Sequence, residues 1–153
     1  MQSITIDTWI DAPIERCFDA ARDLDLHVAS IPGTNERAIG GKLTGLIGAD
    51  EEVTWRARHF FVTQELTSRI TRFDPPHHFR DEMQRGAFKS FVHDHFFVRE
   101  NGRTKMTDHL LFAAPLGILG RIAEVVVLRR YLNRMLTHRA HVIARAAESK
   151  EST

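Results

Sequence analysis

The sequence predicts an α+β fold in which a curved antiparallel sheet of about seven strands wraps around one long C-terminal helix. From about residue 35 to residue 113, alternating apolar and polar runs are separated by turn residues, which is typical of antiparallel strands. After Pro115, apolar residues recur at helical spacing up to about residue 147. Because this helix is the only predicted element long enough to cover the sheet, we expect it to lie across one face.

The N-terminal part of the chain predicts one strand and two short helices. Ser3–Ile10 alternates apolar and polar residues, as a half-buried strand does. Asp11-Ala12-Pro13 then opens a helix, with Asp11 or Ala12 near the cap and Pro13 in the first turn. Asp23–Ser30 predicts a second short helix. The apolar stripe of the first helix consists of Ile14, Cys17, Phe18 and Ala21.

Six further strands are predicted before the long helix. Asp74-Pro75-Pro76 and Arg85-Gly86 punctuate this part of the chain, since proline and glycine mark turns. The C-terminal helix is predicted over about 116–147. The predicted strands are roughly 35–42, 50–59, 60–72, 77–84, 88–99 and 104–113.

The last two strands meet at Asn101-Gly102, a dipeptide that strongly favours a two-residue hairpin turn. A three-residue loop with a glycine bulge would shift the register by one residue and set Asp94 against Asp108, and directly opposed like charges are unfavourable. We therefore expect the two-residue turn. It pairs Glu100 with Arg103, Phe97 with Met106, His95 with Asp108, His93 with Leu110 and Phe91 with Phe112.

This register places His93, His95 and Asp108 on one apolar face of the hairpin. His95 and Asp108 form a non-hydrogen-bonded pair, whose Cβ atoms lie roughly 4.5–5.5 Å apart. A carboxylate at that distance orients the imidazole and favours its protonated form, whereas burial opposes protonation. The opposite face, with its own Asp94 and His109, is also fairly apolar, so alternation leaves open which face is inside.

The face on which Asp81 lies depends on the turn that follows it. A three-residue loop at 85–87 would place Asp81 beside His93 and add a second carboxylate to that face. A two-residue turn would send Asp81 to the other face. The residues leave both arrangements open.

Length and charge exclude several classes of protein. The 153 residues are most simply one domain, residues 1–148, followed by a frayed tail at 149–153. A net charge of +1 gives no overall attraction to nucleic acid or to anionic membranes. Arginines of the C-terminal helix are interspersed with glutamates and predict an exposed helix face rather than a nucleic-acid site. They are Arg129, Arg130, Arg134, Arg139 and Arg145.

Cysteine content and apolar runs indicate a cytoplasmic protein. The single cysteine, Cys17, excludes an internal disulfide and suits a reducing compartment. The N-terminus lacks the basic and apolar segments of a signal peptide. The apolar run Leu110–Leu128 is interrupted by proline, glycine and charged residues, so we expect no membrane insertion. An apolar outer sheet face would favour a homodimer.

Several short motifs follow one another in the order of the predicted elements. They are Trp9–Glu15, Cys17-Phe18, Leu26–Pro32, Ile70–Pro75, Phe79–Asp81, Gly86–Phe88, His93–Phe96, Gly102–Asp108 and Pro115–Gly117. Together they resemble the bacterial SRPBCC or START-like polyketide cyclase/dehydratase superfamily, in a subgroup with His-x-His and a later aspartate. The resemblance implies a helix-grip fold, shared with birch-pollen-allergen-like proteins, and a ligand-binding or cyclase-like function. Gly86-Ala87-Phe88 stands where related sequences usually have Gly-Pro-Phe.

Our first hypothesis is that the protein binds a small hydrophobic or aromatic molecule in a cavity between the sheet and the C-terminal helix. His93, His95 and Asp108 would orient a polar group of that molecule, and no cofactor is expected. The same apolar residues could instead fill the core and leave no cavity. The predicted wall consists of Trp55, Phe91, Phe97, Met106, Leu110, Phe112, Leu128 and Leu132, with Met135.

Two alternatives use the same polar residues. In an acid/base enzyme of the cyclase/dehydratase type, His95 would transfer protons, Asp108 would orient it, and His93 would be a second proton donor or a contact to an oxyanion. In a metal site, the three residues would bind zinc or non-haem iron, because two histidines and a carboxylate suit these ions. The resembled superfamily is not typically metal-dependent, so the metal site ranks last.

Overall fold

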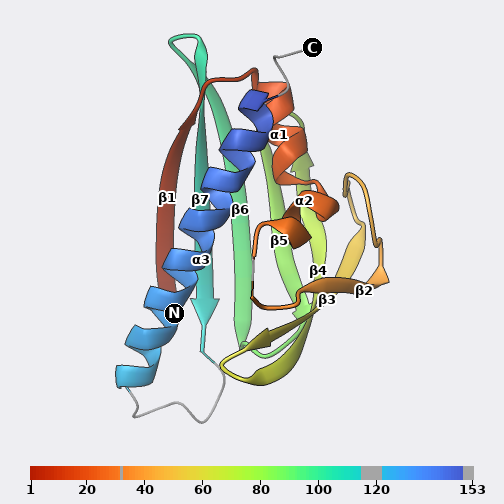
Figure 1. The fold of residues 1–153 in the computed structure, drawn as a ribbon, viewed down its shortest axis with the longest axis vertical. Helices are drawn as coiled ribbons and strands as arrows, with labels where there is room; N and C mark the ends of the chain where they lie inside the picture. The colour runs from red at the N-terminus through yellow and green to blue at the C-terminus, as the bar shows by residue number, and fades with distance from the viewer. Residues whose placement is uncertain (32, 115–121, 150–153) are drawn as a thin grey trace.

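The chain folds into a seven-stranded antiparallel sheet that curves around a long C-terminal helix (Figure 1). This computed structural model describes residues 1–31, 33–114 and 122–149. The strand order is β1-β7-β6-β5-β4-β3-β2, which confirms the predicted fold class. The elements are β1 (Gln2–Ile10), α1 (Ile14–Ala21), α2 (Leu24–Ala29), β2 (Arg37–Gly41), β3 (Glu52–His59), β4 (Val62–Asp74), β5 (His78–Arg85), β6 (Ser90–Glu100), β7 (Arg103–Ala113) and α3 (Ile122–Ser149).

The helices begin close to where the sequence predicts them. The Asp23 carboxylate caps α2 by accepting hydrogen bonds from the backbone N–H groups of Asp25 and Leu26, at 2.9 and 3.2 Å. Pro13 is the N-cap residue of α1, so its prediction within the first turn is wrong by one position. The predicted start of the C-terminal helix at 116 lies outside the described residues, as do the last four residues of the predicted tail.

The β3–β4 turn lies one residue later than predicted. Phe60 and Phe61 form this turn, with φ angles of 50° and 65°, whereas the predicted second strand of the pair starts at residue 60. Pairing of His59 with Val62 leaves only these two residues to reverse the chain. Because aromatic residues favour strands, Phe60 and Phe61 do not predict a turn.

The β6–β7 hairpin has the predicted register. Asn101 and Gly102 have φ angles of 52° and 75°, as a two-residue turn with left-handed backbone requires. His95 lies opposite Asp108, and His93 lies opposite Leu110. In the β5–β6 ladder Asp81 lies opposite His93, so both side chains point to the same face of the sheet. This is the face that the three-residue loop would give, although residues 86–89 separate the two strands.

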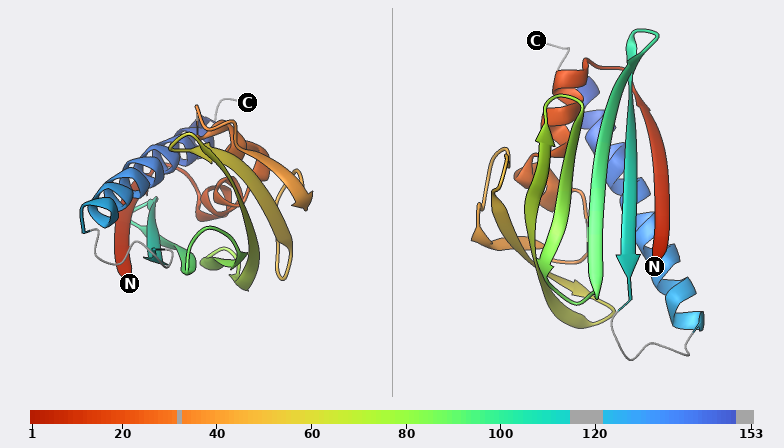
Figure 2. Two further views of the ribbon diagram at one scale, coloured as in Figure 1. Left: turned by 90° about the horizontal axis from the view of Figure 1, so that it is seen from below. Right: turned by 180° about the vertical axis from the view of Figure 1, so that it is seen from behind.

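Burial decides which face of the hairpin is inside. His93, His95 and Asp108 are all at most 4% exposed on the concave face, which curves around α3 (Figure 2). On the convex face, Asp94 lies opposite His109 in the ladder, but its carboxylate accepts hydrogen bonds from Arg80 and His78 instead. That ion pair explains how a buried carboxylate is tolerated on the outer face.

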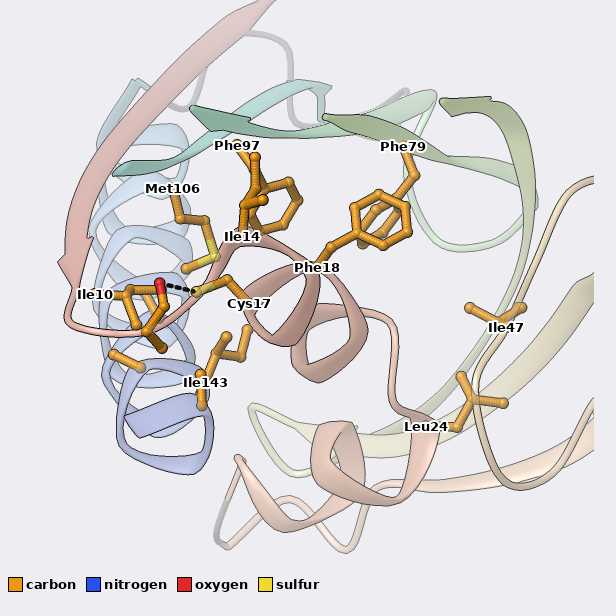
Figure 3. Packing of buried hydrophobic residues seen from close by; sticks show 14 of the residues in the cluster. Ile10, Ile14, Cys17, Phe18, Leu24, Ile47, Phe79, Phe97, Met106 and Ile143 are labelled. Atoms are coloured by element: carbon orange, nitrogen blue, oxygen red, sulfur yellow. Dashed lines mark hydrogen bonds between the residues drawn. The ribbon is translucent and has the colours of Figure 1, made fainter. Parts of the chain in front are cut away.

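The main core occupies the end of the sheet where α1 packs. Phe18 of α1 lies 5.4–5.6 Å, between ring centroids, from Phe73, Phe79 and Phe97. Figure 3 shows Phe18 and Cys17 between the sheet and the C-terminal part of α3, represented by Ile143. No described helix is long and apolar enough to cross a membrane.

Candidate functional site

A cavity of about 520 Å³ lies between the concave sheet face and residues 125–139 of α3. This volume falls in the range of about 300–1,000 Å³ that small-molecule sites occupy. Strands β3 to β6 supply one wall, and α2 and α3 supply the other. The apolar part of the wall includes Trp55, Ala57, Leu66, Leu128, Leu132 and Met135.

His93 brings the predicted polar cluster to the wall of this cavity. Its Nε2 lies 3.0 Å from Asp108 Oδ1, at hydrogen-bonding geometry. His95 Nδ1 lies 2.8 Å from the same oxygen but is not aligned for a hydrogen bond with any described residue. The His95 ring stacks on Phe79, with centroids 4.3 Å apart, and also contacts the His93 ring. His95 and Asp108 therefore lie behind His93, away from the cavity.

Burial and the neighbouring charges decide the protonation of this cluster. Burial alone would raise the pKa of Asp108, but the His93 hydrogen bond and the adjacent His95 outweigh it and hold that pKa well below its usual range. For His93, burial and the nearby His95 lower the pKa of the imidazole, and Asp108 only partly offsets them. The resulting state is an ionised Asp108 carboxylate beside a neutral His93 ring.

Asp81 adds a second carboxyl group to the same wall. Burial raises its pKa, and a hydrogen bond with Ser68 only partly opposes that rise. Its Oδ1 is buried and has no hydrogen-bond partner among the residues that the structure describes. A buried acceptor without a partner is costly, and such groups in a cavity wall are suited to binding a ligand.

Arg139 lines the same cavity from α3. Its Nη2 lies 2.5 Å from His27 Nε2, which in turn lies 2.9 Å from Glu36 Oε1. Burial lowers the pKa of Arg139, but a guanidinium remains charged in proteins. The buried Arg139 Nε has no hydrogen-bond partner within the described ranges.

His27 is held between a cation and an anion. Burial, reinforced by Arg139, lowers the pKa of His27 to about 4, although Glu36 acts in the opposite direction. The Trp55 ring stacks on the His27 ring at a centroid distance of 4.1 Å. In the neutral ring, Nε2 either donates to Glu36 or accepts from Arg139, but it cannot do both. Arg139 is therefore only partly satisfied by the protein.

The predicted wall residues divide into two groups in the structure. Trp55, Phe91, Leu128, Leu132 and Met135 line the cavity. The other four are at most 1% exposed and do not line the cavity. Phe97 and Met106 belong to the core around α1, whereas Leu110 and Phe112 pack with Ile4 of β1 behind the wall residues.

Arg139 corrects a prediction of the sequence analysis. The sequence pattern groups it with the exposed arginines of the C-terminal helix, but its side chain lines the cavity. A signal for this position exists, since Arg139 follows Leu132 by seven residues and Met135 by four, on the helix stripe that faces the sheet. No comparable pattern marks His27 or Glu36, which lie in and after a short helix.

His93, His95 and Asp108 also meet the simplest requirement of a metal site. One ligand atom from each residue lies within 4.8 Å of the other two, and all three residues are buried. However, ligands about 2.0–2.1 Å from a tetrahedral zinc ion lie roughly 3.3 Å from one another. The observed 2.8 and 3.0 Å separations are shorter, and they match hydrogen-bonding distances.

Comparison with solved structures reveals the same architecture in proteins of very different sequence. TTHA0849 from Thermus thermophilus is 16% identical, with a TM-score of 0.72 over 99% of this chain and 100% of that chain. The chain has the predicted helix-grip fold. Neither the scan of protein families nor the search of curated proteins finds a match.

Two further helix-grip structures match across nearly the whole chain. The di-domain ARO/CYC StfQ from the steffimycin biosynthetic pathway is 10% identical, with a TM-score of 0.73 over 99% of this chain and 52% of that chain. The major latex-like protein 151 from Panax ginseng is 12% identical, with a TM-score of 0.64 over 99% and 98% of the two chains. At such identities these likenesses establish the fold, and function must be argued from the site.

Proposed function

We propose that this helix-grip protein binds a small, mainly apolar or aromatic molecule in the cavity beneath α3. The observation that carries the proposal is a cavity of about 520 Å³ whose largely apolar wall also carries the polar side chains of Asp81, His93 and Arg139. Asp81 Oδ1 and Arg139 Nε are buried there without partners among the described residues. A ligand group that donates to Asp81 and accepts from Arg139 would satisfy both atoms.

Fluorescence of Trp55 offers a direct test. The chain has two tryptophans, and Trp9→Phe leaves Trp55, on the cavity wall, as the only one. We expect 8-anilinonaphthalene-1-sulfonate to quench Trp55 fluorescence saturably in this background. Adding Ala57→Phe, which fills the cavity from β3, is expected to weaken binding at least about tenfold.

The control for that variant is Thr5→Phe, at an exposed position on β1. It adds the same ring outside the cavity and should leave the affinity for the probe unchanged. Equal affinity in wild type and in the Ala57→Phe variant, with both folded by near-ultraviolet circular dichroism, would contradict the proposal. Native mass spectrometry of the purified protein provides an independent search for a bound small molecule.

Acid/base catalysis is the second candidate function, and the position of His93 favours it. His93 lies on the cavity wall with Asp108 bound to its Nε2, and its lowered pKa keeps the ring neutral and able to accept a proton. The sequence predicts this role for His95, but in the structure His95 is not on the cavity wall. We now assign the role to His93, with Asp108 as the residue that orients it.

Hydrogen–deuterium exchange of a carbonyl compound separates catalysis from binding. 2-Acetonaphthone in deuterium oxide, followed by proton NMR, reports removal of a methyl proton next to the carbonyl. If His93 is a general base, the protein accelerates exchange and His93→Gln abolishes the acceleration while quenching of Trp55 by the ketone persists. Exchange at the rate of buffer alone, despite bound ketone, would leave binding as the function.

A further inference from the structure

The turn between β3 and β4 exposes an unusual amount of aromatic surface. Phe61 is 90% exposed, and Phe60 and Val62 are each 55% exposed. Isolated apolar residues are common on protein surfaces, but three consecutive ones at the tip of a hairpin form a contiguous apolar patch. The β3–β4 turn and the beginning of α3 lie at the same end of the molecule (Figure 1).

The fold itself does not call for phenylalanine at this turn. The backbone has φ angles of 50° and 65° at Phe60 and Phe61, close to those of 52° and 75° at Asn101 and Gly102 in the other two-residue hairpin turn. Asn-Gly suits this left-handed backbone, whereas a bulky side chain is strained there. The favoured dipeptide, Asn-Gly, is therefore present at the β6–β7 turn, whereas the β3–β4 turn carries the less stable Phe-Phe.

Exposed residues of α3 extend the patch beside the cavity. The Phe60 ring lines the cavity and contacts the Tyr131 ring, with centroids 4.8 Å apart. One helical turn before Tyr131, Val126 and Val127 are 44% and 54% exposed. We call Phe60, Phe61, Val62, Val126 and Val127 the aromatic tip.

Arginines lie close to the aromatic tip. The Arg58 guanidinium carbon lies 6.0 Å from the centroid of the Phe61 ring. Arg129 and Arg130 are exposed and lie about one helical turn after Val126 and Val127, and Arg129 also donates a hydrogen bond to the Ser3 carbonyl of β1. Aromatic rings at headgroup depth, with cations beside them, are what an anionic membrane surface binds.

We propose that the aromatic tip docks on the surface of an anionic lipid bilayer. Phe60 and Phe61 enter the headgroup region, and Arg58, Arg129 and Arg130 contact the lipid phosphates. Docking of this kind requires no membrane-spanning segment, and it brings the cavity next to the apolar phase in which its ligand is soluble. Transfer of a ligand between the bilayer and the cavity rests on the proposed function. The docking itself does not.

Vesicle co-sedimentation tests the docking. We expect the protein to sediment with vesicles of phosphatidylcholine mixed with phosphatidylglycerol and to remain in solution with phosphatidylcholine alone. Phe61→Gly should reduce the bound fraction about tenfold, because it removes the most exposed ring of the tip. Glycine tolerates the φ angle of 65° at this position, so this variant should melt no lower than wild type.

Two further variants make the result specific. Val98→Ser removes an apolar side chain of 55% exposure from β6, near the turn at the far end of the molecule, and should not change vesicle binding. Replacing Arg129 and Arg130 together by glutamine should abolish the preference for phosphatidylglycerol. Phe61 is not on the cavity wall, so quenching of Trp55 by the naphthalene probe should persist in Phe61→Gly.

Two results would overturn the docking proposal. One is that the wild-type protein does not bind anionic vesicles, or that the wild type and Phe61→Gly bind them equally well. The other is a dimer, seen by analytical ultracentrifugation, that Phe61→Gly converts to a monomer while vesicles remain unbound. The tip would then be a contact between copies of this chain, and the proposed function would still stand.

Discussion

His93 Nε2 lies 3.0 Å from Asp108 Oδ1, although the two residues are diagonal and not opposite in the β6–β7 ladder. His95, which is directly opposite Asp108, lies closer, at 2.8 Å, but is not aligned for a hydrogen bond. A diagonal neighbour gives the imidazole room to reach the carboxylate with its far nitrogen. The two histidines of β6 are therefore not equivalent: His93 lies on the cavity wall, and His95 lies behind it.

Removing Asp108 is expected to destabilise the fold strongly. Asp108→Ala leaves the buried, neutral His93 ring without its acceptor, and the free energy of unfolding in urea should fall by about 1–3 kcal/mol. Asp7→Ala provides the control, because Asp7 is an exposed carboxylate on β1 that contacts Lys105 at 3.3 Å. That change should cost less than about 1 kcal/mol. Similar losses for the two variants would show that the buried cluster contributes little to stability.

Replacing Asp81 should stabilise the protein. Asp81→Asn removes a buried carboxyl whose Oδ1 has no partner in the described part of the chain, so unfolding should cost about 1–3 kcal/mol more near neutral pH. Asp94→Asn is the control, because it makes the same substitution at a buried carboxylate that has a partner. It breaks the ion pair with Arg80 and should lower the free energy of unfolding.

The pH dependence of the Asp81 variant follows from the direction of its pKa shift. The folded-state pKa of Asp81 is raised, so the native group contributes favourably only below its unfolded value of 3.8, and this contribution is lost as the pH rises through the folded pKa. The gain from asparagine should therefore disappear below about pH 4. A gain that persists undiminished in acid would contradict the assignment.

Acidification should destabilise the fold through His27. Its pKa falls from 6.5 to about 4 on folding, so the unfolded chain takes up the proton first. The favourable contribution of neutral His27 is present above pH 6.5 and is lost as the pH falls from about 6.5 to about 4, by up to about 3 kcal/mol. Urea unfolding across this range should be flatter in His27→Gln. An NMR titration of the His27 ring near pH 6.5 would contradict the shift.

Divalent metal should not stabilise the protein. The Asp108 oxygen lies 2.8 and 3.0 Å from the two histidine nitrogens, closer than two ligands of one zinc ion, so zinc or ferrous iron added to the purified protein should leave the melting temperature unchanged. Elemental analysis by mass spectrometry checks the same expectation. One equivalent of zinc per chain, lost in Asp108→Ala, would establish the metal site.

Local sequence rules predicted most of the elements and one complete hairpin. Asn101-Gly102 determines the β6–β7 register because the turn residues and the paired residues are neighbours in the chain. The same rules failed at Phe60-Phe61, where aromatic residues that favour strands form a turn. There the pairing of β3 with β4 over eight residue pairs outweighs the preference of two residues.

By itself the sequence determined the order of the elements, the helix-grip resemblance and the placement of His93, His95 and Asp108 on one face. Only the tertiary structure decided that this face is the inner one and that His93, rather than His95, lies on the cavity wall. It also brought Arg139 from α3 to Glu36 and Asp81, which are far from it in the sequence. The physical reason is that turn geometry acts between neighbours, whereas the wall of a cavity depends on how a helix packs across a curved sheet.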